Sequence, residues 1–204
     1  MDHSTQMLLF DLGGVLVELA GTERMLHFAG NSMTESRLWE MWLNSSVVRD
    51  FETGRIEPRK FAEALIVEFS LSAEPEEILA ELAEWVPGPV TGAAQFLEEL
   101  SADFKLGILS NTNAIHWERI DAKMGITQYF DFIFVSCQTG LMKPDRRAYE
   151  LVIEETGYPP GSIVYFDDLE RNTSAALETG IRAFCVKSIE DIKRILLSLS
   201  GFPA

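Results

Sequence analysis

Short apolar runs recur along the chain, and most of them end at polar residues. The runs cover residues 7–10, 105–109, 132–135, 162–166 and 181–186. Continuous apolar runs bounded by glycine or polar residues are typical of strands that are buried on both faces of a parallel sheet. The pattern therefore predicts five buried strands.

Amphipathic helical patterns alternate with these strands from residue 90 onward. We expect Thr91 to cap the first of these helices, and later ones to end at Gly125, Gly157 and Gly180. Alternation of strand and helix predicts βαβ units, which place helices on both faces of a parallel sheet. The predicted fold class is therefore α/β, with a Rossmann-like parallel sheet.

The segment 18–85 interrupts this alternation, because its apolar residues follow helical spacing and it contains no convincing strand. Trp39, Trp42 and Leu43 are one such group, and a Pro-Gly-Pro run marks the exit of the segment. We predict that 18–85 is a helical insertion into an α/β core formed by 1–17 and 86–204. The tryptophan group is interpreted as the small core of the insertion, and the alternative is that part of it lines a substrate pocket.

Composition narrows the classes of partner. The chain has 204 residues, with 32 acidic and 17 basic side chains and a net charge of −15. This length suits one α/β domain with one insertion. A chain with this net negative charge repels nucleic acid and anionic membranes. Neither is therefore expected as a partner. The same charge also repels phosphorylated metabolites, unless the site supplies local positive charge.

The cysteines bear on the cellular compartment. Cys137 and Cys185 lie in apolar stretches that we interpret as buried strands. Two reduced core thiols and the lack of a signal peptide predict a cytoplasmic protein. No apolar run approaches the roughly 20 residues that span a bilayer. The polar residues 1–6 are expected to form a disordered lead-in, and the oligomeric state is left open.

Polar side chains gather at the predicted strand ends, where open parallel sheets bind ligands. Converging carboxylates require a cation, and oxygen ligands suit Mg²⁺. A lysine, a serine hydroxyl and backbone N–H groups would hold a phosphoryl group, which a neighbouring carboxylate can attack to form an aspartyl-phosphate. The residues concerned are Asp11, Ser110, Asn111, Thr112, Lys143, Asp167 and Asp168.

Four ordered motifs carry a family resemblance. They are Phe10–Val15, Leu109–Thr112, Lys143–Asp145 and Phe166–Asp168, the last followed by Asn172. They resemble the four motifs of the haloacid dehalogenase (HAD) superfamily along almost the whole chain. The inserted helices are similar to the helical cap of these enzymes. The run from Ser to His after the second strand resembles the α-D-glucose-1-phosphate phosphatase-like branch.

The resemblance implies a metal site. Asp11 matches the nucleophile, one oxygen of which would also bind Mg²⁺. Asp168 matches the metal-binding carboxylate of the fourth motif. Asp167 beside it would be an accessory metal ligand, or would hold a metal-binding group in place without touching the metal. Gly13 matches the position that contributes a backbone carbonyl to the metal.

The resemblance also implies a phosphate site and an activity. Ser110 and Asn111 match the phosphate-binding second motif, and Lys143 matches the lysine that stabilises the phosphoryl oxygens. The expected function is a Mg²⁺-dependent phosphatase that acts on small phosphorylated metabolites, sugar phosphates among them, through an aspartyl-phosphate on Asp11. Specificity would reside in cap side chains.

Two positions depart from the usual family pattern. Most phosphatases of the superfamily carry an acid–base aspartate where this chain has Gly13, and general acid–base help is worth roughly 10²–10⁴ in rate. The substrate then has a good leaving group, or another residue supplies the proton, or turnover is slow or absent. Asn172 replaces an acidic residue, which we regard as a minor change. His116 is interpreted as a half-buried helix residue, the alternative being contact with substrate.

Two other functions remain open at this stage. In a metal-independent haloacid dehalogenase, Asp11 would attack a carbon atom of the substrate. The neighbouring carboxylates of Asp167 and Asp168 disfavour this function, because without a cation they would repel a substrate that is itself a carboxylate. A catalytically weak relative that binds a phosphorylated ligand or a protein partner is compatible with Gly13.

Overall fold

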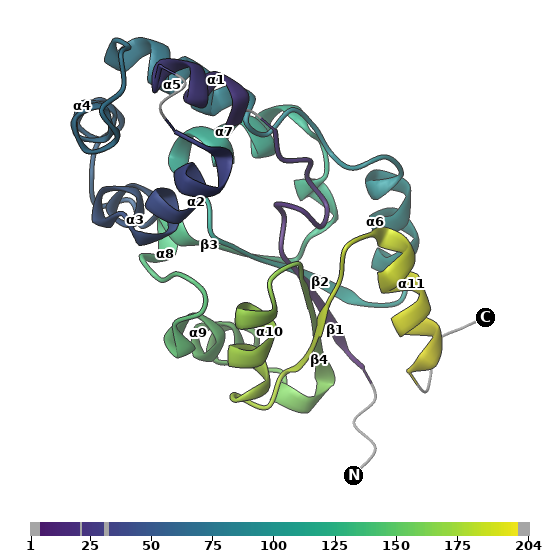
Figure 1. Cartoon of the computed structure of the whole chain (residues 1–204). Helices are drawn as coiled ribbons and strands as arrows, with labels where there is room; N and C mark the ends of the chain where they lie inside the picture. The colour runs from purple at the N-terminus through teal and green to yellow at the C-terminus, as the bar shows by residue number, and fades with distance from the viewer. Residues whose placement is uncertain (1–4, 21, 31–32, 200–204) are drawn as a thin grey trace.

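The computed structural model describes residues 5–20, 22–30 and 33–199, and at its centre lies a five-stranded parallel sheet (Figure 1). The strand order is β3-β2-β1-β4-β5, and every neighbouring pair is parallel. The bounds are β1 Met7–Phe10, β2 Lys105–Ser110, β3 Phe132–Val135, β4 Ile163–Asp167 and β5 Arg182–Cys185. The five predicted strands and the α/β class are confirmed, with ends that differ by a residue at most.

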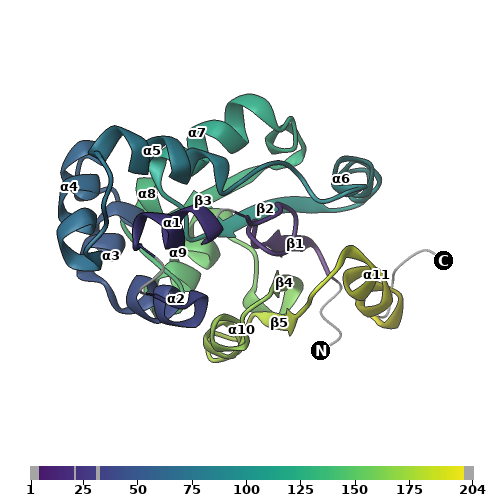
Figure 2. The ribbon, with the colours of Figure 1, turned by 45° about the horizontal axis from the view of Figure 1, so that its top comes forward.

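Helices cover both faces of the sheet (Figure 2). One face packs against α6 Ala93–Ser101, α7 Ala114–Lys123 and α11 Ile189–Ser198. The other face packs against α9 Arg146–Thr156 and α10 Glu170–Leu177. Successive side chains of each strand enter opposite layers, so Phe10 lies in the first layer and Leu9 in the second. Two short 3₁₀ turns, Thr127–Tyr129 and Pro160–Ser162, lead into β3 and β4.

The described residues between β1 and α6 form five helices, and their spacing had predicted helices. They are α1 Thr22–Phe28, α2 Glu35–Asn44, α3 Ser46–Glu52, α4 Pro58–Phe69 and α5 Pro75–Glu84. These inserted helices share a separate hydrophobic cluster. Trp42 is buried at its centre, with its ring centroid 4.9 Å from that of Trp85. Leu43 does not belong to this cluster, because it points outward and is 52% exposed.

Two helix pairs join the inserted helices to the rest of the described chain. Helix α5 packs on α7, and α3 packs on the short helix α8, Ser136–Thr139, which follows β3 directly (Figure 1). Gly54 allows the second contact, because its φ is +70° and an added Cβ would lie 2.4 Å from the Cys137 carbonyl oxygen. Only glycine fits so close to another backbone.

Two local predictions were wrong. Gly92, rather than Thr91, is the N-terminal capping position of α6. The cysteines are not buried in strands: Cys137 is half-buried in α8, two residues beyond the end of β3, and Cys185 is exposed. Cys185 ends β5, which is an edge strand with a neighbour on one side only, so its end faces outward.

Two expectations concern the chain ends and membranes. The first four residues of the expected lead-in lie outside the described residues. In the part of the chain that the structure describes, every helix is too short or too polar to cross a lipid bilayer.

Candidate active site

The candidate site lies where the strand order reverses beside β1. The chain passes from β1 to β2 and β3 on one side, and then crosses to β4 and β5 on the other. Such a reversal leaves a crevice at the carboxyl ends of the central strands. Asp11 follows β1, Ser110 ends β2 and Asp167 ends β4. The Asp11 amide donates to the Phe166 carbonyl at 2.9 Å, which extends the pairing of β1 with β4 to the site.

Three carboxylates converge in this crevice. One oxygen from each of Asp11, Asp167 and Asp168 lies within 4.8 Å of the others. The turn after β1 makes room for them, because Gly14 has a φ of +74° and an added Cβ would lie 2.9 Å from an Asp168 oxygen. The second glycine of the first motif is therefore required because a side chain at this position would clash with Asp168.

Lys143 is the cation of the site and is almost completely buried. Its Nζ lies 2.9 Å from Asp11 Oδ1 and 2.7 Å from Asp167 Oδ2. Burial by itself would lower the pKa of Lys143, but Asp11 and Asp167 outweigh it and hold that pKa above its usual value. The lysine is therefore charged, and it bridges Asp11 and Asp167.

Asp167 is surrounded by donors. Besides Lys143, it accepts hydrogen bonds from the Tyr165 hydroxyl, the Leu169 amide at 2.8 Å and the Asn172 side-chain amide at 3.0 Å. Burial would raise the pKa of Asp167, but Lys143 and these donors lower it overall. Both of its oxygens are thus engaged, and its evident effect in the structure is to hold Lys143.

Asp11 and Asp168 are less fully compensated. Burial is the largest cause that raises the pKa of each, and the charge of Asp167 adds to it; Lys143 opposes both effects. Three carboxylates share the buried Lys143, and the charge of Lys187 also lowers the pKa of Asp168, so the negative charge is only partly compensated. An oxygen-rich site with that deficit fits a hard divalent cation such as Mg²⁺.

The two predicted residues of the second motif do different things. Ser110 is buried and shares a side-chain hydrogen bond with Asp11. The Asn111 side chain is already engaged: its amide nitrogen donates to the Lys143 carbonyl at 2.9 Å, and its oxygen accepts from the Lys143 amide at 2.8 Å. Asn111 therefore holds the backbone of Lys143 in place, a role that the sequence did not predict.

Tyr165 is a second residue that sequence reasoning missed. It is buried in β4, and its hydroxyl donates to Asp167 Oδ2. Its spacing was an available clue, because residues two apart in a strand point to the same face. Asn172 is buried in α10, and its Oδ1 accepts no hydrogen bond from any residue that the structure describes.

His116 does not join the carboxylates. It is half-buried on α7, where its Nε2 lies 2.7 Å from the Leu82 carbonyl of α5 and its Nδ1 lies 3.1 Å from the Asn113 side-chain amide. Burial lowers the pKa of His116 to about 4, so the neutral ring donates from Nε2 to Leu82. The interpretation as a half-buried helix residue is confirmed.

Gly13, where relatives place the acid–base aspartate, has an apolar neighbour. An added Cβ at Gly13 would lie 3.3 Å from the side chain of Leu19, which is 56% exposed. No proton donor comes from this position.

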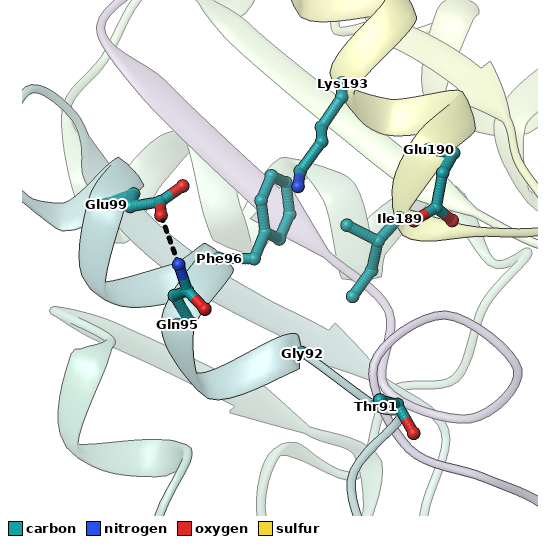
Figure 3. A pocket seen from close by; sticks show the side chains of 8 residues that line it. All are labelled: Thr91, Gly92, Gln95, Phe96, Glu99, Ile189, Glu190 and Lys193. Carbon is teal, nitrogen blue, oxygen red and sulfur yellow. Dashed lines mark hydrogen bonds between the residues drawn. The ribbon is translucent and has the colours of Figure 1, made fainter.

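A small pocket of about 110 Å³ lies elsewhere, between α6 and α11 (Figure 3). Lys193 sits with its Nζ 5.6 Å from the centre of the Phe96 ring, and Gln95 donates to Glu99 at 2.9 Å. The polar groups of Lys193, Gln95 and Glu99 are thus engaged within the pocket, and no residue that lines it belongs to the four motifs. The pocket is therefore not the candidate active site.

Curated relatives have similar sequences. The chain is 26% identical over 200 residues to flavin mononucleotide hydrolase 1 of Arabidopsis thaliana, covering 95% of this chain and 77% of the relative. It is also 26% identical to phosphatase MT3486 of Mycobacterium tuberculosis, covering 90% and 88% respectively. Several other curated relatives are much longer, and the match spans a fifth of their length or less.

A solved structure and a family model agree with these relatives. The HAD family enzyme BT-2542 of Bacteroides thetaiotaomicron, in complex with magnesium and inorganic phosphate, superposes with a TM-score of 0.78 at 25% identity, covering 94% of this chain and 99% of that one. The model of the haloacid dehalogenase-like hydrolases matches residues 5–180. This chain therefore belongs to the haloacid dehalogenase-like hydrolase family.

Proposed function

We propose that this hydrolase is a Mg²⁺-dependent phosphatase of small phosphorylated metabolites, with sugar phosphates among its substrates. The observation that carries the proposal is the buried triangle in which Lys143 bridges Asp11 and Asp167, at 2.9 and 2.7 Å, beside the half-buried Asp168. It joins a nucleophile, a phosphate-binding cation and a carboxylate-rich cation site at one strand end.

Asp11 is the proposed nucleophile. Its carboxylate attacks the phosphorus, the bond to the leaving oxygen breaks, and an aspartyl-phosphate forms. Lys143 and the Ser110 hydroxyl hold phosphoryl oxygens and favour the charge that develops on them. Asp167 and Asn111 keep Lys143 in place through its side chain and its backbone, respectively. Water then attacks the phosphoenzyme and releases inorganic phosphate.

Mg²⁺ would be held by Asp11, Asp168 and the Gly13 carbonyl, with Asp167 as accessory. When bound, it supplies charge neutralisation and Lewis acidity to the phosphoryl group. The excess of carboxylates over cations around Lys143 supports this assignment, as does the magnesium in the complex of BT-2542.

The inserted helices are proposed to act as a cap. We assign residues 18–85 to the cap and residues 1–17 and 86–204 to the catalytic core. The separate hydrophobic cluster of α1–α5 supports this division. A cap that closes over the carboxylates would exclude bulk water and select the leaving group.

A panel of phosphorylated metabolites tests the function. Phosphate release is measured with Mg²⁺ and with EDTA, and Asp11→Asn is the blank. We expect release that needs Mg²⁺ and disappears in Asp11→Asn, because the amide is neither nucleophile nor anionic ligand. Binding of a phosphate analogue without turnover across the panel would contradict the enzyme assignment and favour a regulatory role. Halide release from 2-chloropropionate in EDTA would instead indicate a dehalogenase.

A further inference from the structure

Gly13 offers no proton donor for the leaving group, but a glutamate of the inserted helices, Glu52, interacts electrostatically with Lys143 of the site. We propose that Glu52, the last residue of α3, is the general acid that protonates the leaving oxygen and the base that then activates water. The inference rests on the proposed phosphatase function and identifies a catalytic residue for it.

The end of α3 is held against the core. Both ribbon views show α3 beside α8 (Figure 1, Figure 2), and the two helices are in contact. Two residues after Glu52, Gly54 approaches the Cys137 backbone so closely that no other residue fits. Helix α8 in turn adjoins the second motif, because the Thr112 amide donates to Ser136 Oγ at 2.9 Å. Glu52 therefore belongs to a helix that packs on α8, the helix that adjoins the second motif.

The Glu52 carboxyl group interacts with charges at the site. It is half-buried, it shares a side-chain hydrogen bond with Trp42, whose indole N–H is the donor, and it lies close enough to Lys143 and Arg171 to interact with both charges. Lys143 contacts Asp11 at 2.9 Å, and Arg171 lies on α10, three residues after Asp168. Glu52 is thus within electrostatic reach of the lysine that contacts Asp11, and it comes from the inserted helices and not from a strand end.

Its protonation suits the task. Burial raises the pKa of Glu52 to about 7, although the hydrogen bond from Trp42 and the charges of Arg171 and Lys143 oppose the rise. Near neutral pH the group therefore exists in both forms, which is the condition for efficient proton transfer in both directions.

The proton balance closes without another reactant. As Asp11 forms its bond to phosphorus, the bond from phosphorus to the leaving oxygen breaks, and that oxygen takes the proton of Glu52. The resulting carboxylate accepts a proton from water as the water oxygen attacks the aspartyl-phosphate. Inorganic phosphate leaves, Asp11 is restored as a carboxylate, and Glu52 is again protonated.

The test compares two esters in the wild type and in Glu52→Gln. Glutamine still accepts the hydrogen bond of Trp42, so the fold is preserved while the proton is lost. We expect kcat/KM for glycerol phosphate, which has a poor leaving group, to fall by about 10²–10⁴. We expect kcat/KM for p-nitrophenyl phosphate, whose leaving group needs no acid, to change little.

Two controls separate this role from a structural one. Glu63→Gln alters an exposed carboxylate of α4 that pairs with Arg59, and it should leave both esters unchanged. Thermal unfolding of Glu52→Gln should match that of the wild type. In the wild type, kcat/KM for glycerol phosphate should fall above pH about 7 as Glu52 loses its proton, and Glu52→Gln should lack that limb.

The outcomes are distinct. Equal losses on both esters, or no loss on either, would overturn the role of Glu52 while leaving the phosphatase standing. If the wild type hydrolyses neither ester nor any other phosphate, the proposed function fails and this inference fails with it.

Discussion

Lys143 shows how much of the site depends on one side chain. A buried ammonium is costly unless it is paired, and here two carboxylates and the clamp of Asn111 on its backbone hold it in place. The same Asp11 oxygen, Oδ1, contacts the lysine and accepts a hydrogen bond from the Leu12 amide at 2.7 Å. A fixed nucleophile needs little reorganisation before it attacks.

Replacing Lys143 should destabilise the protein as well as inactivate it. Lys143→Met leaves Asp11 and Asp167 facing each other without a cation, and breaking a buried pair typically costs about 3–5 kcal/mol. We expect a lower urea midpoint, with part of the loss recovered on addition of Mg²⁺. Lys105→Met is the matched control, because Lys105 pairs with Asp131 at the surface and should matter little. An unchanged midpoint for Lys143→Met would contradict the pairing.

At the scale of elements, the docking of α5 on α7 joins the insertion to the core. The His116 ring donates to the Leu82 carbonyl from α7, and Arg119 on the same helix donates to the Val86 carbonyl at 3.0 Å. The Leu82 carbonyl, in the last turn of α5, accepts the His116 bond in addition to the one from the Trp85 amide, and the Val86 carbonyl lies just beyond the end of the helix. The second contact, of α3 on α8, instead depends on a glycine.

The His116 contact predicts a pH dependence of stability. Its pKa is about 4 in the folded protein and near 6.5 when unfolded, so below pH 6.5 the unfolded chain binds the extra proton. The contribution of the neutral ring is complete above pH about 6.5 and is lost as the pH falls towards 4, with a slope of at most about 1.4 kcal/mol per unit.

This slope can be isolated by difference. Urea unfolding of the wild type and of His116→Gln, which keeps a donor for Leu82 but does not titrate, is compared at pH about 7.5 and about 5. We expect the wild type to lose more free energy of unfolding than the variant over that interval. Parallel losses would show that His116 is not the titrating group.

At the scale of the whole molecule, the net charge of −15 and the carboxylate triangle act in the same direction. Self-repulsion destabilises a compact acidic chain, and it is strongest where carboxylates are packed together. A cation bound in the crevice would relieve it there.

Mg²⁺ is therefore expected to raise the melting temperature. A ligand that binds only the folded state at about 100 times its Kd adds about 2.7 kcal/mol to the free energy of unfolding. EDTA should reverse the shift, and Asp168→Asn should remove most of it. Sodium chloride at equal ionic strength controls for general screening. A shift of equal size in Asp168→Asn would place the binding elsewhere.

The sequence by itself determined the strands and the helical character of the segment between β1 and α6. The spacing of apolar residues reflects which side chains are buried. A strand that is buried on both faces is apolar at every position, as residues 7–10 are. Parallel strands end at a common edge, so Asp11, Lys143 and Asp167 were expected near one another before any coordinates. The exposure of Cys185 escaped this reasoning, because an apolar run does not show which strand is at the edge.

Only the tertiary structure decided which partner each polar group takes. Asn111 holds the backbone of Lys143 across 32 residues, and Lys143 reaches Asp167 across 24. The electrostatic interaction of Glu52 with Lys143 depends on the docking of α3 on α8. Such contacts depend on the order of strands and the packing of helices, and the local pattern of apolar and polar positions encodes neither, since it records how deeply a residue is buried and not what lies beside it.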